Sequence, residues 1–338
     1  MNVLFIFLGF TKLLIATGRS AADPLDTVEV IDLSSPNTTC KGLPNYLLKT
    51  TWSIGGLYNK TIPIICGGIS GNVTNKDCFK LEEHFWIPIQ PMNVPRWSAS
   101  ATTYPSAAAK SSQDLLVIGG YNSEAGGYLS SVEVFGPNGW NRINANLPEG
   151  IHWGCAVTVN ETTFVFTGGR AASQTTVTSD THWFDALNGK GSGGPRLNVA
   201  RRSHGCGVIH SDEGVYLVVV GGYNGSQYLD STEILEVGSN EWRVGPKLPM
   251  PIDDVIVVED PATNSLLIVS GKYSRKETKV TVNNNDNHQT EAEVTSIYRL
   301  TGPISDESRW EELPQKIKVG RRQGPVAFFI PDYLTDCQ

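Results

Sequence analysis

Five apolar runs, spaced about fifty residues apart, each end in a glycine pair or in what remains of one. The runs read "IICGG", "LVIGG", "VFTGG", "VVVGG" and "IVSGK". Their glycines are Gly67, Gly68, Gly119, Gly120, Gly168, Gly169, Gly221, Gly222 and Gly271. A period of this length indicates one supersecondary unit repeated along the chain, which constrains the fold more than any composition value does.

Each unit follows one order of segments. An extended run precedes the glycine-ended run, and a short alternating segment such as "SVEVF" or "STEIL" follows it. Trp140 and Trp242 each come 20 residues after the second glycine of their unit, whereas Trp310 comes 39 residues after Gly271. Four short strands with turns between them predict an antiparallel sheet. No sustained apolar period of 3.6 is present, so we expect almost no helix.

These units resemble the Kelch repeat, the four-stranded blade of one class of β-propeller. The resemblance runs from Trp52 to Trp310 and is strongest in Leu115 to Trp140 and Tyr216 to Trp242. It implies an all-β fold, a Kelch-type β-propeller, in which glycine permits positive φ where a strand ends.

The two ends of the chain supply the remaining blade. "DTVEVIDL" (Asp26 to Leu33) has the pattern of a third strand, and "GRRQGPVAFFIPD" (Gly320 to Asp332) begins like an inner strand. Together they predict six blades, with the N- and C-terminal strands sharing the last one and closing the ring. No segment has the pattern of that blade's second strand, which leaves its completeness open.

The first residues have the character of a secretory signal peptide. An apolar stretch, Val3 to Phe10, is followed by Lys12 and a run of small residues, and it is too short to predict a membrane span. We therefore expect a signal peptide over residues 1–22, cleaved after Gly18 or Ala22, and a single propeller over residues 23–338. A polar, Asn-rich insertion at 276–293 is expected to be a mobile loop.

Without residues 1–22 the basic count falls from 27 to 25 against 34 acids, a net charge of −9. That balance argues against nucleic-acid binding, which requires a basic surface. The mature chain is expected to be secreted, monomeric and without a membrane span.

Six cysteines, an even number, suit an oxidising compartment. Cys66 ends a second strand and Cys78 begins the neighbouring third, so we expect a disulfide between them. Cys40 and Cys337 flank the terminal segments, and we expect a second disulfide there. Cys155 and Cys206 share one register in successive inner strands, where a disulfide and two buried thiols are both open. Five sequons fit secretion, namely Asn37, Asn59, Asn72, Asn160 and Asn224.

No catalytic signature is evident, so we expect a non-enzymatic protein without a cofactor or a metal. His152 and His204 begin successive inner strands, but no third ligand accompanies them, and zinc sites need three or four. The set of Tyr, His and Cys that copper-radical propeller oxidases require is not present either.

Charged residues gather in the loops that lead into the inner strands. Arg96 lies there in the second unit, Arg201 and Arg202 in the fourth, and Arg321 and Arg322 in the sixth, alternating with acids in units three and five. Tyr121 and Tyr223, which follow the glycines, should reach the same face. Either these charges pair between blades, or they form a recognition surface; we favour pairing for any single arginine.

The leading hypothesis is a secreted protein that binds another extracellular protein, an acidic one if the arginines contact it. The alternative is a propeller that binds or modifies glycans.

Overall fold

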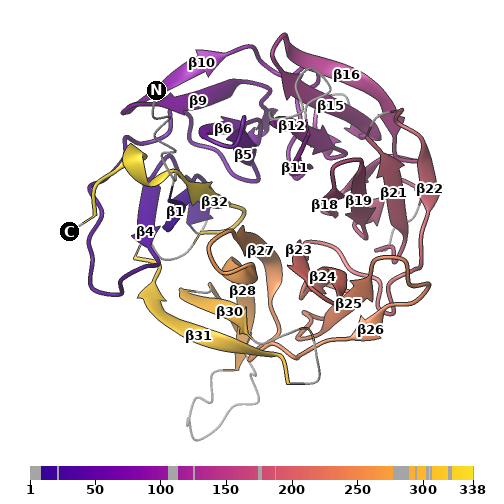
Figure 1. The fold of residues 1–338 in the computed structure, drawn as a ribbon. Helices are drawn as coiled ribbons and strands as arrows, with labels where there is room; N and C mark the ends of the chain where they lie inside the picture. The colour runs from indigo at the N-terminus through magenta and orange to yellow at the C-terminus, as the bar shows by residue number, and fades with distance from the viewer. Residues whose placement is uncertain are drawn as a thin grey trace, which may run out of the picture.

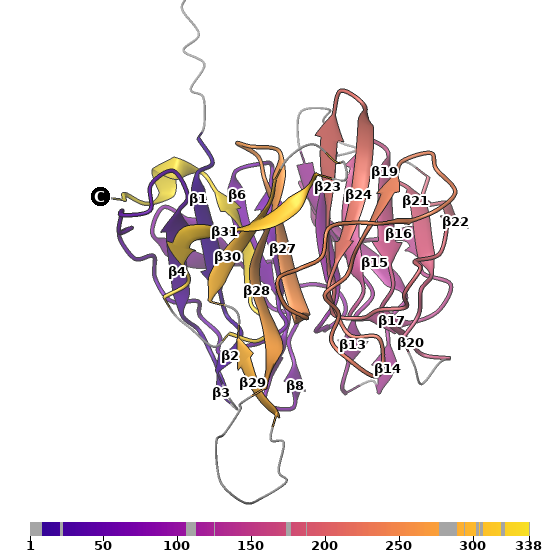
Figure 2. The same ribbon diagram turned by 90° about the horizontal axis from the view of Figure 1, so that it is seen from below.

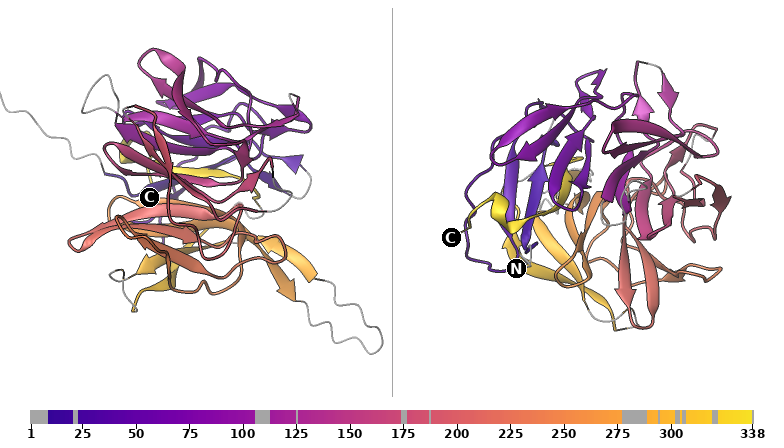
Figure 3. Two further views of the ribbon diagram at one scale, coloured as in Figure 1. Left: turned by 90° about the vertical axis from the view of Figure 1, so that its right-hand side faces the viewer. Right: turned by 45° about the horizontal axis from the view of Figure 1, so that its top comes forward.

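The structure, a computed structural model, describes residues 9–20, 23–105, 113–124, 126–173, 177–186, 188–276, 289–293, 295–301, 304, 307–318 and 322–337. Six antiparallel sheets stand as blades around a central channel (Figure 1), and the views in Figure 3 show the same ring from two further sides. The predicted all-β, six-bladed propeller is therefore confirmed.

Five blades have four strands each, running from the channel outward. Blade 1 contains β5 (Ile54–Tyr58), β6 (Ile62–Cys66), β9 (Cys78–Glu82) and β10 (Phe85–Ile89). Blade 2 contains β11 (Ser100–Pro105), β12 (Gln113–Ile118), β15 (Ser131–Gly136) and β16 (Gly139–Asn146). Blade 3 contains β18 (Cys155–Asn160), β19 (Thr163–Thr167), β21 (Thr181–Asp185) and β22 (Gly191–Gly193).

Blade 4 contains β23 (Gly205–Ser211), β24 (Gly214–Val220), β25 (Thr232–Glu236) and β26 (Arg243–Val244). Blade 5 contains β27 (Asp253–Asp260), β28 (Ser265–Lys276), β30 (Ser296–Thr301) and β31 (Arg309–Lys316), and β29 (Gln289–Glu293) pairs with the extension of β28. Most of the insertion expected to be mobile, residues 277–288, lies outside the described residues.

The sixth blade joins the two ends of the chain, as predicted. Its order is β32 (Val326–Ile330), β1 (Lys12–Ala16) and β4 (Val28–Asp32), so the missing second strand is β1 (Figure 1). Leu13 and Ile15 pack against blade 5 and Leu14 packs against blade 1, and all three side chains are fully buried. The segment expected to be removed with a signal peptide over 1–22 thus forms the middle of a blade, and cleavage after Gly18 or Ala22 would delete that strand.

The strand β1 also ends in a sixth copy of the glycine motif. Thr17 and Gly18 have φ values of 60° and 96°, which match 69° and 99° at Gly119 and Gly120. At Gly120 a Cβ would lie 3.0 Å from the Trp97 carbonyl oxygen, so the second position requires glycine both for φ and for space.

The core consists of apolar clusters that fill the spaces between adjacent blades. Between blades 1 and 2, for example, Trp140 packs with Ile64, Leu115 and Val117. Trp242 lies between blades 3 and 4, and Trp310 lies between blades 4 and 5. The repeat tryptophans therefore hold neighbouring blades together, as bulky side chains at fixed offsets in the repeat predict.

Three cysteine pairs lie at disulfide distance. Cys66 and Cys78 face each other across β6 and β9, and Cys40 is joined to Cys337, which connects the two ends of the chain. The pair left open by the sequence, Cys155 and Cys206, is also bonded, with a Cα–Cα distance of 5.9 Å between inner strands of blades 3 and 4.

Short two-stranded ribbons extend from one end of the ring (Figure 2). They are β2 (Arg19–Ser20) with β3 (Asp23–Pro24), β7 (Ile69–Ser70) with β8 (Val73–Thr74), β13 (Tyr121–Asn122) with β14 (Gly127–Tyr128), and β17 (Ile151–His152) with β20 (Arg170–Ala171). A single turn of 3-10 helix, η1 (Asp332–Leu334), precedes the C-terminus. Within the described residues, no helix is long and apolar enough to cross a membrane.

Candidate functional site

The loops that enter the inner strands meet at one mouth of the channel, on the end that carries the short ribbons. One residue from each blade has a left-handed backbone there: Trp52, Ser98, Trp153, Ser203, Asp254 and Gly324. Main-chain hydrogen bonds connect them around the mouth. The N–H groups of Trp52, Ser98, Trp153 and Ser203 donate to the carbonyl groups of Gly324, Trp52, Ser98 and Trp153, respectively, over 2.7–3.1 Å.

Asp254 completes this ring with its side chain. Its carboxylate accepts the Gly324 N–H at 2.9 Å and the Trp52 indole N–H at 3.3 Å, while the Val255 N–H donates to the Ser203 carbonyl. Burial, together with the adjacent charge of Asp253, raises the pKa of Asp254 to about 6, although Lys272 and the two N–H donors oppose the rise. A small pocket of about 100 Å³ opens at this point, between Trp52, Trp153 and Asp254.

Half-buried aromatic and arginine side chains form a continuous series of contacts, and two of them, Trp52 and Trp153, line the pocket. We call this set the aromatic rim; it comprises Trp52, Trp97, Trp153, Arg202, Tyr223 and Tyr228. The Trp97 ring lies 5.4 Å from that of Trp52 and 5.9 Å from that of Trp153. The Arg202 guanidinium then lies 4.4 Å from the Trp153 ring and 4.8 Å from the Tyr223 ring.

Two further cations end the series, since Arg19 lies over Trp52 and Lys272 over Tyr228. Stacking of a cation on an aromatic face holds both groups in place. Main-chain bridges fix the rim from below, because the N–H groups of Trp97 and Arg202 donate to the carbonyls of Tyr121 and Tyr223. These contacts therefore hold the side chains of the rim in fixed positions.

His152 lies beneath the rim and not at its surface. Its ring stacks on Trp153 at 4.0 Å and meets the edge of Tyr128 at 4.8 Å. Burial, and then the charges of Arg170 and Arg202, lower its pKa to about 3, so the imidazole is neutral at physiological pH. It acts as an aromatic support for Trp153.

His204 is buried as well, with its Nε2 atom 2.9 Å from the Thr167 hydroxyl. Burial, and then the charge of Arg201, lower its pKa to about 3. Among the described residues, no three His, Cys, Asp or Glu side chains are placed to hold a metal ion.

Three of the seven residues predicted for the binding face are buried and hydrogen-bonded within their own blades, so the prediction is wrong for them. Arg96 is 0% exposed; its guanidinium donates to the carbonyls of Gly119 and Ser131 and to the Glu133 carboxylate at 2.5 Å. Because no part of this side chain reaches the surface, it cannot contact a partner.

Arg201 repeats this arrangement in blade 4, with donors to Gly221, Ser231 and Glu233. Arg322 repeats it in blade 6, where it donates to the carbonyls of Thr17 and Thr27. The alternation of sign noticed in the sequence thus reflects a buried arginine in every second blade. The role is structural, as favoured for single arginines, but the expected pairing between blades is wrong for Arg96 and Arg201, because each pairs with a glutamate of its own blade.

The other predicted face residues have different positions. Tyr121, Arg202 and Tyr223 are half-buried at the channel mouth, and Arg321 lies outside the described residues. Trp52, Trp97, Trp153 and Tyr228 were not among the residues predicted for this face. A signal for the tryptophans was present, because "TWS", "RWS" and "HWG" each stand directly before an inner strand.

The sequons occupy both ends of the ring. Asn37, Asn59, Asn72 and Asn160 are exposed, whereas Asn224 is half-buried beside Tyr223 and accepts three hydrogen bonds from Ser226 and Gln227. A glycan on Asn224 would stand next to the aromatic rim.

Comparisons with known proteins agree with this architecture. A family model described as "Kelch motif" matches residues 200–249. A solved structure titled "Structure of YjhT" is similar with a TM-score of 0.62 and 14% identity, covering 83% of this chain and 88% of that chain. A comparison with curated proteins found no match. At 14% identity the structural likeness shows the fold alone.

The ring of blades defines a β-propeller, and the aromatic rim lies at one mouth of its channel. The chain is therefore a six-bladed β-propeller in which residues 200–249 match the Kelch motif.

Proposed function

We propose that this chain is a secreted, non-enzymatic module that binds another protein through the aromatic rim. The observation that carries the proposal is the series of half-buried Trp, Tyr and Arg side chains around the channel mouth. Trp, Tyr and Arg are the residue types that dominate binding energy at protein interfaces, especially when rigidly held. Kelch propellers generally act as interaction scaffolds, which agrees with this use.

The charges at the mouth favour a partner that presents carboxylates. Arg202 belongs to the rim, Arg19 and Lys272 lie at its two ends, and each of the three stacks on an aromatic ring. A guanidinium held in this way keeps N–H donors that match a carboxylate. Arg202 is the strongest candidate for the contact, because it lies at the centre of the series.

Secretion is supported by the cysteines and sequons. All described cysteines are paired in disulfides, which persist in oxidising compartments. Four of the five sequons are exposed and so accessible to glycosylation.

Affinity capture from the native extracellular fluid, followed by titration of the captured protein, tests the proposal. We expect Arg202→Ala to weaken binding by about tenfold or more, as loss of a central anchor does, and binding to weaken as salt rises. The matched control is Arg309→Ala, which removes a highly exposed arginine from the outer strand of blade 5. If Arg202→Ala binds the captured protein as tightly as Arg309→Ala does, the rim is not the interface.

The alternative is a glycan-binding or glycan-modifying role, and one observation favours it. Trp52 and Trp153 border the small central pocket, which gives a ring-shaped ligand flat aromatic surfaces beside the Asp254 carboxylate. Glycan-array binding or turnover of a sugar substrate that is lost on Trp153→Ala, without capture of any protein, would replace the first proposal with this one.

A further inference from the structure

Within the described residues, blade 6 lacks the outermost strand that every other blade has, and the edge of β4 has no partner strand there. The Thr17 N–H donates to the Thr27 carbonyl and the Leu33 N–H to the Thr11 carbonyl, which sets the register of β1 against β4. In an antiparallel pair, alternate residues point their backbone groups to opposite sides. The N–H and C=O groups of Val28, Val30 and Asp32 therefore point outward, where a fourth strand would pair.

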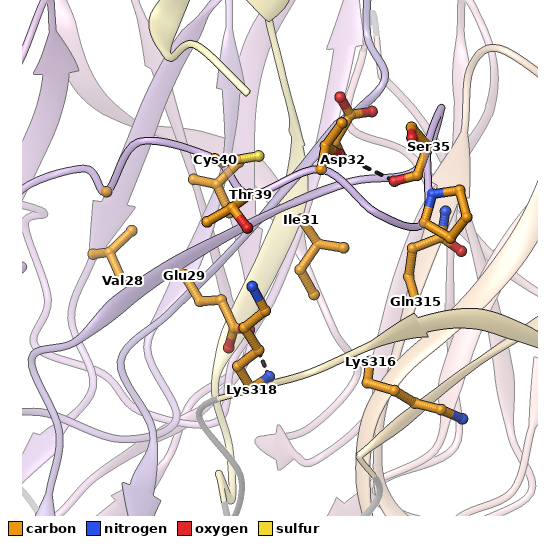
Figure 4. A pocket seen from close by; sticks show the side chains of 14 residues that line it. Val28, Glu29, Ile31, Asp32, Ser35, Thr39, Cys40, Gln315, Lys316 and Lys318 are labelled. Carbon is orange, nitrogen blue, oxygen red and sulfur yellow. Dashed lines mark hydrogen bonds between the residues drawn. The ribbon is translucent and has the colours of Figure 1, made fainter. Parts of the chain in front are cut away.

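A pocket of about 270 Å³ occupies the place of that strand (Figure 4). All five residues of β4 line one wall, and the segments 35–42 and 315–318 line the others. Because these segments flank β4, the free edge is recessed. A recessed edge admits one extended chain, whereas β4 of a second copy, equally recessed, could not reach it.

The complete blades show what such a strand brings. In blades 1, 2 and 5 the outer strand places a buried tryptophan directly opposite a third-strand residue: Trp86 opposite Leu81, Trp140 opposite Phe135, and Trp310 opposite Leu300. Trp242 of blade 4 is buried in the same way.

The matching position in blade 6 is Ile31, because Glu29 and Glu133 correspond: each accepts a main-chain N–H from the segment before its inner strand. Counting two residues on from Glu29 and Glu133 gives Ile31 and Phe135. Ile31 lines the pocket and has no strand opposite it on the outer side. The pocket is thus the place of the missing tryptophan.

A second, independent observation comes from Gln315. This side chain is 8% exposed and lines the pocket, and its Nε2 donates to the Leu33 carbonyl, while its Oε1 is buried without a hydrogen-bond partner. A buried unpaired acceptor costs stability. In blade 4, the indole N–H of Trp242 donates to the Pro195 carbonyl, in the segment that corresponds to 315–318. An indole in the blade 6 pocket would similarly have Gln315 Oε1 as acceptor.

We propose that the free edge of β4 binds an extended segment of a partner protein that carries a tryptophan, which adds as the fourth strand of blade 6. Main-chain hydrogen bonds to Val28, Val30 and Asp32 supply the affinity, and the tryptophan opposite Ile31 supplies the specificity. This site is separate from the aromatic rim and does not depend on the function proposed for it.

Synthetic peptides with the sequences of the chain's own outer strands, residues 138–147 and 308–316, serve as probes, since both contain the tryptophan in strand context. We expect fluorescence anisotropy to detect binding of at least one, and hydrogen exchange to show new protection of Val28, Val30 and Asp32. Replacing the peptide tryptophan with Ala should weaken binding by about tenfold or more. No binding by either peptide at millimolar concentration overturns the proposal.

Two variants locate the binding. Val30→Pro removes an outward N–H without touching the β1 ladder and should abolish binding, whereas Val30→Thr keeps both the N–H and the shape and should bind normally. Gln315→Met should weaken binding of the tryptophan peptide but not binding of the same peptide with Trp replaced by Phe. This comparison remains valid even if Val30→Pro does not fold. Equal binding by all variants refutes the site.

Two results would assign the groove to another occupant and also refute the proposal. One is a dimer of the wild type that Val30→Pro dissociates in sedimentation experiments. The other is peptide binding that appears only in a variant beginning at Gly9.

Discussion

At the scale of the residue, two adjacent arginines have opposite roles. Arg201 is 0% exposed and is paired with Glu233 at 2.7 Å, whereas Arg202 lies half-buried on the aromatic rim. Nothing in the pair "RR" separates them, because burial depends on which side chain points between strands and which points to the channel mouth. Composition and spacing located both residues but could not assign their roles.

The difference predicts unequal effects on stability. Arg201→Met leaves Glu233 buried without its counter-charge and should cost about 3–5 kcal/mol, visible as a large fall in melting temperature. Arg202→Ala removes a side chain at the surface and should cost about 1 kcal/mol or less. The double variant Arg201→Met/Glu233→Gln should recover part of the loss. If Arg201→Met melts at the same temperature as the wild type, the buried Arg201–Glu233 pair does not stabilise the blade.

Asp254 predicts a pH dependence of stability. Folding raises its pKa to about 6, above the unfolded value of about 3.9, so ionisation is costlier in the folded chain. Its stabilising contribution is therefore complete below about pH 4, is lost as pH rises to about 6, and is constant above that. The change is on the order of 3 kcal/mol.

The measurement is the difference in unfolding free energy between the wild type and Asp254→Asn, which does not titrate. Between about pH 4 and 6, the wild type should lose unfolding free energy relative to Asp254→Asn. Glu259, whose pKa burial raises to about 7, titrates in a neighbouring range, but it is present in both proteins and cancels. A difference that is flat with pH would contradict the raised pKa.

At the scale of the element, β1 is the strand of blade 6 that was not predicted from the sequence. "LLIATGR" carries the same motif as "LLVIGGY", and Gly18 stands 50 residues before Gly68, but threonine replaces the first glycine. The same residues also fit the end of a signal peptide, and that prediction stays untested. In the structure they form β1, which pairs with both β4 and β32.

This pairing predicts where the chain can be shortened. A variant that begins at Asp23 loses Leu13, Leu14 and Ile15, each at most 1% exposed, and with them roughly 5–9 kcal/mol of apolar burial. That is comparable with the whole stability of a typical domain, so we expect no cooperative melting. A variant that begins at Gly9 keeps β1 and should melt like the full chain. Intact-mass measurement of the native protein should find residues 12–22 retained; a mature N-terminus at Arg19 or Asp23 would contradict this.

At the scale of the whole molecule, ring closure depends on contacts between residues far apart in the sequence. The blades themselves were predictable, since each is a local repeat with turn signals, and the shared blade followed from the unmatched strands at the two ends. The aromatic rim was predicted only in part. The repeat register placed Arg202 and Tyr223 on one face, and Trp52, Trp97 and Trp153 also stand just before inner strands. The contacts between these side chains were not predictable, because they come from separate blades and meet only when the ring closes.

The disulfide between Cys40 and Cys337 gives the last prediction, because it joins the two ends of this ring. It spans 297 residues, against 51 for Cys155–Cys206 and 12 for Cys66–Cys78. In the chain-entropy model a longer loop constrains the unfolded chain more, which gives roughly 6, 4 and 3 kcal/mol for the three bonds in that order. Replacing each pair by serines should therefore lower the denaturation midpoint most for Cys40/Cys337. The Cys66/Cys78 variant is the control, since its two strands remain hydrogen-bonded within one blade. If that control loses more stability than the Cys40/Cys337 variant, the blade 6 strands close the ring without the help of the disulfide.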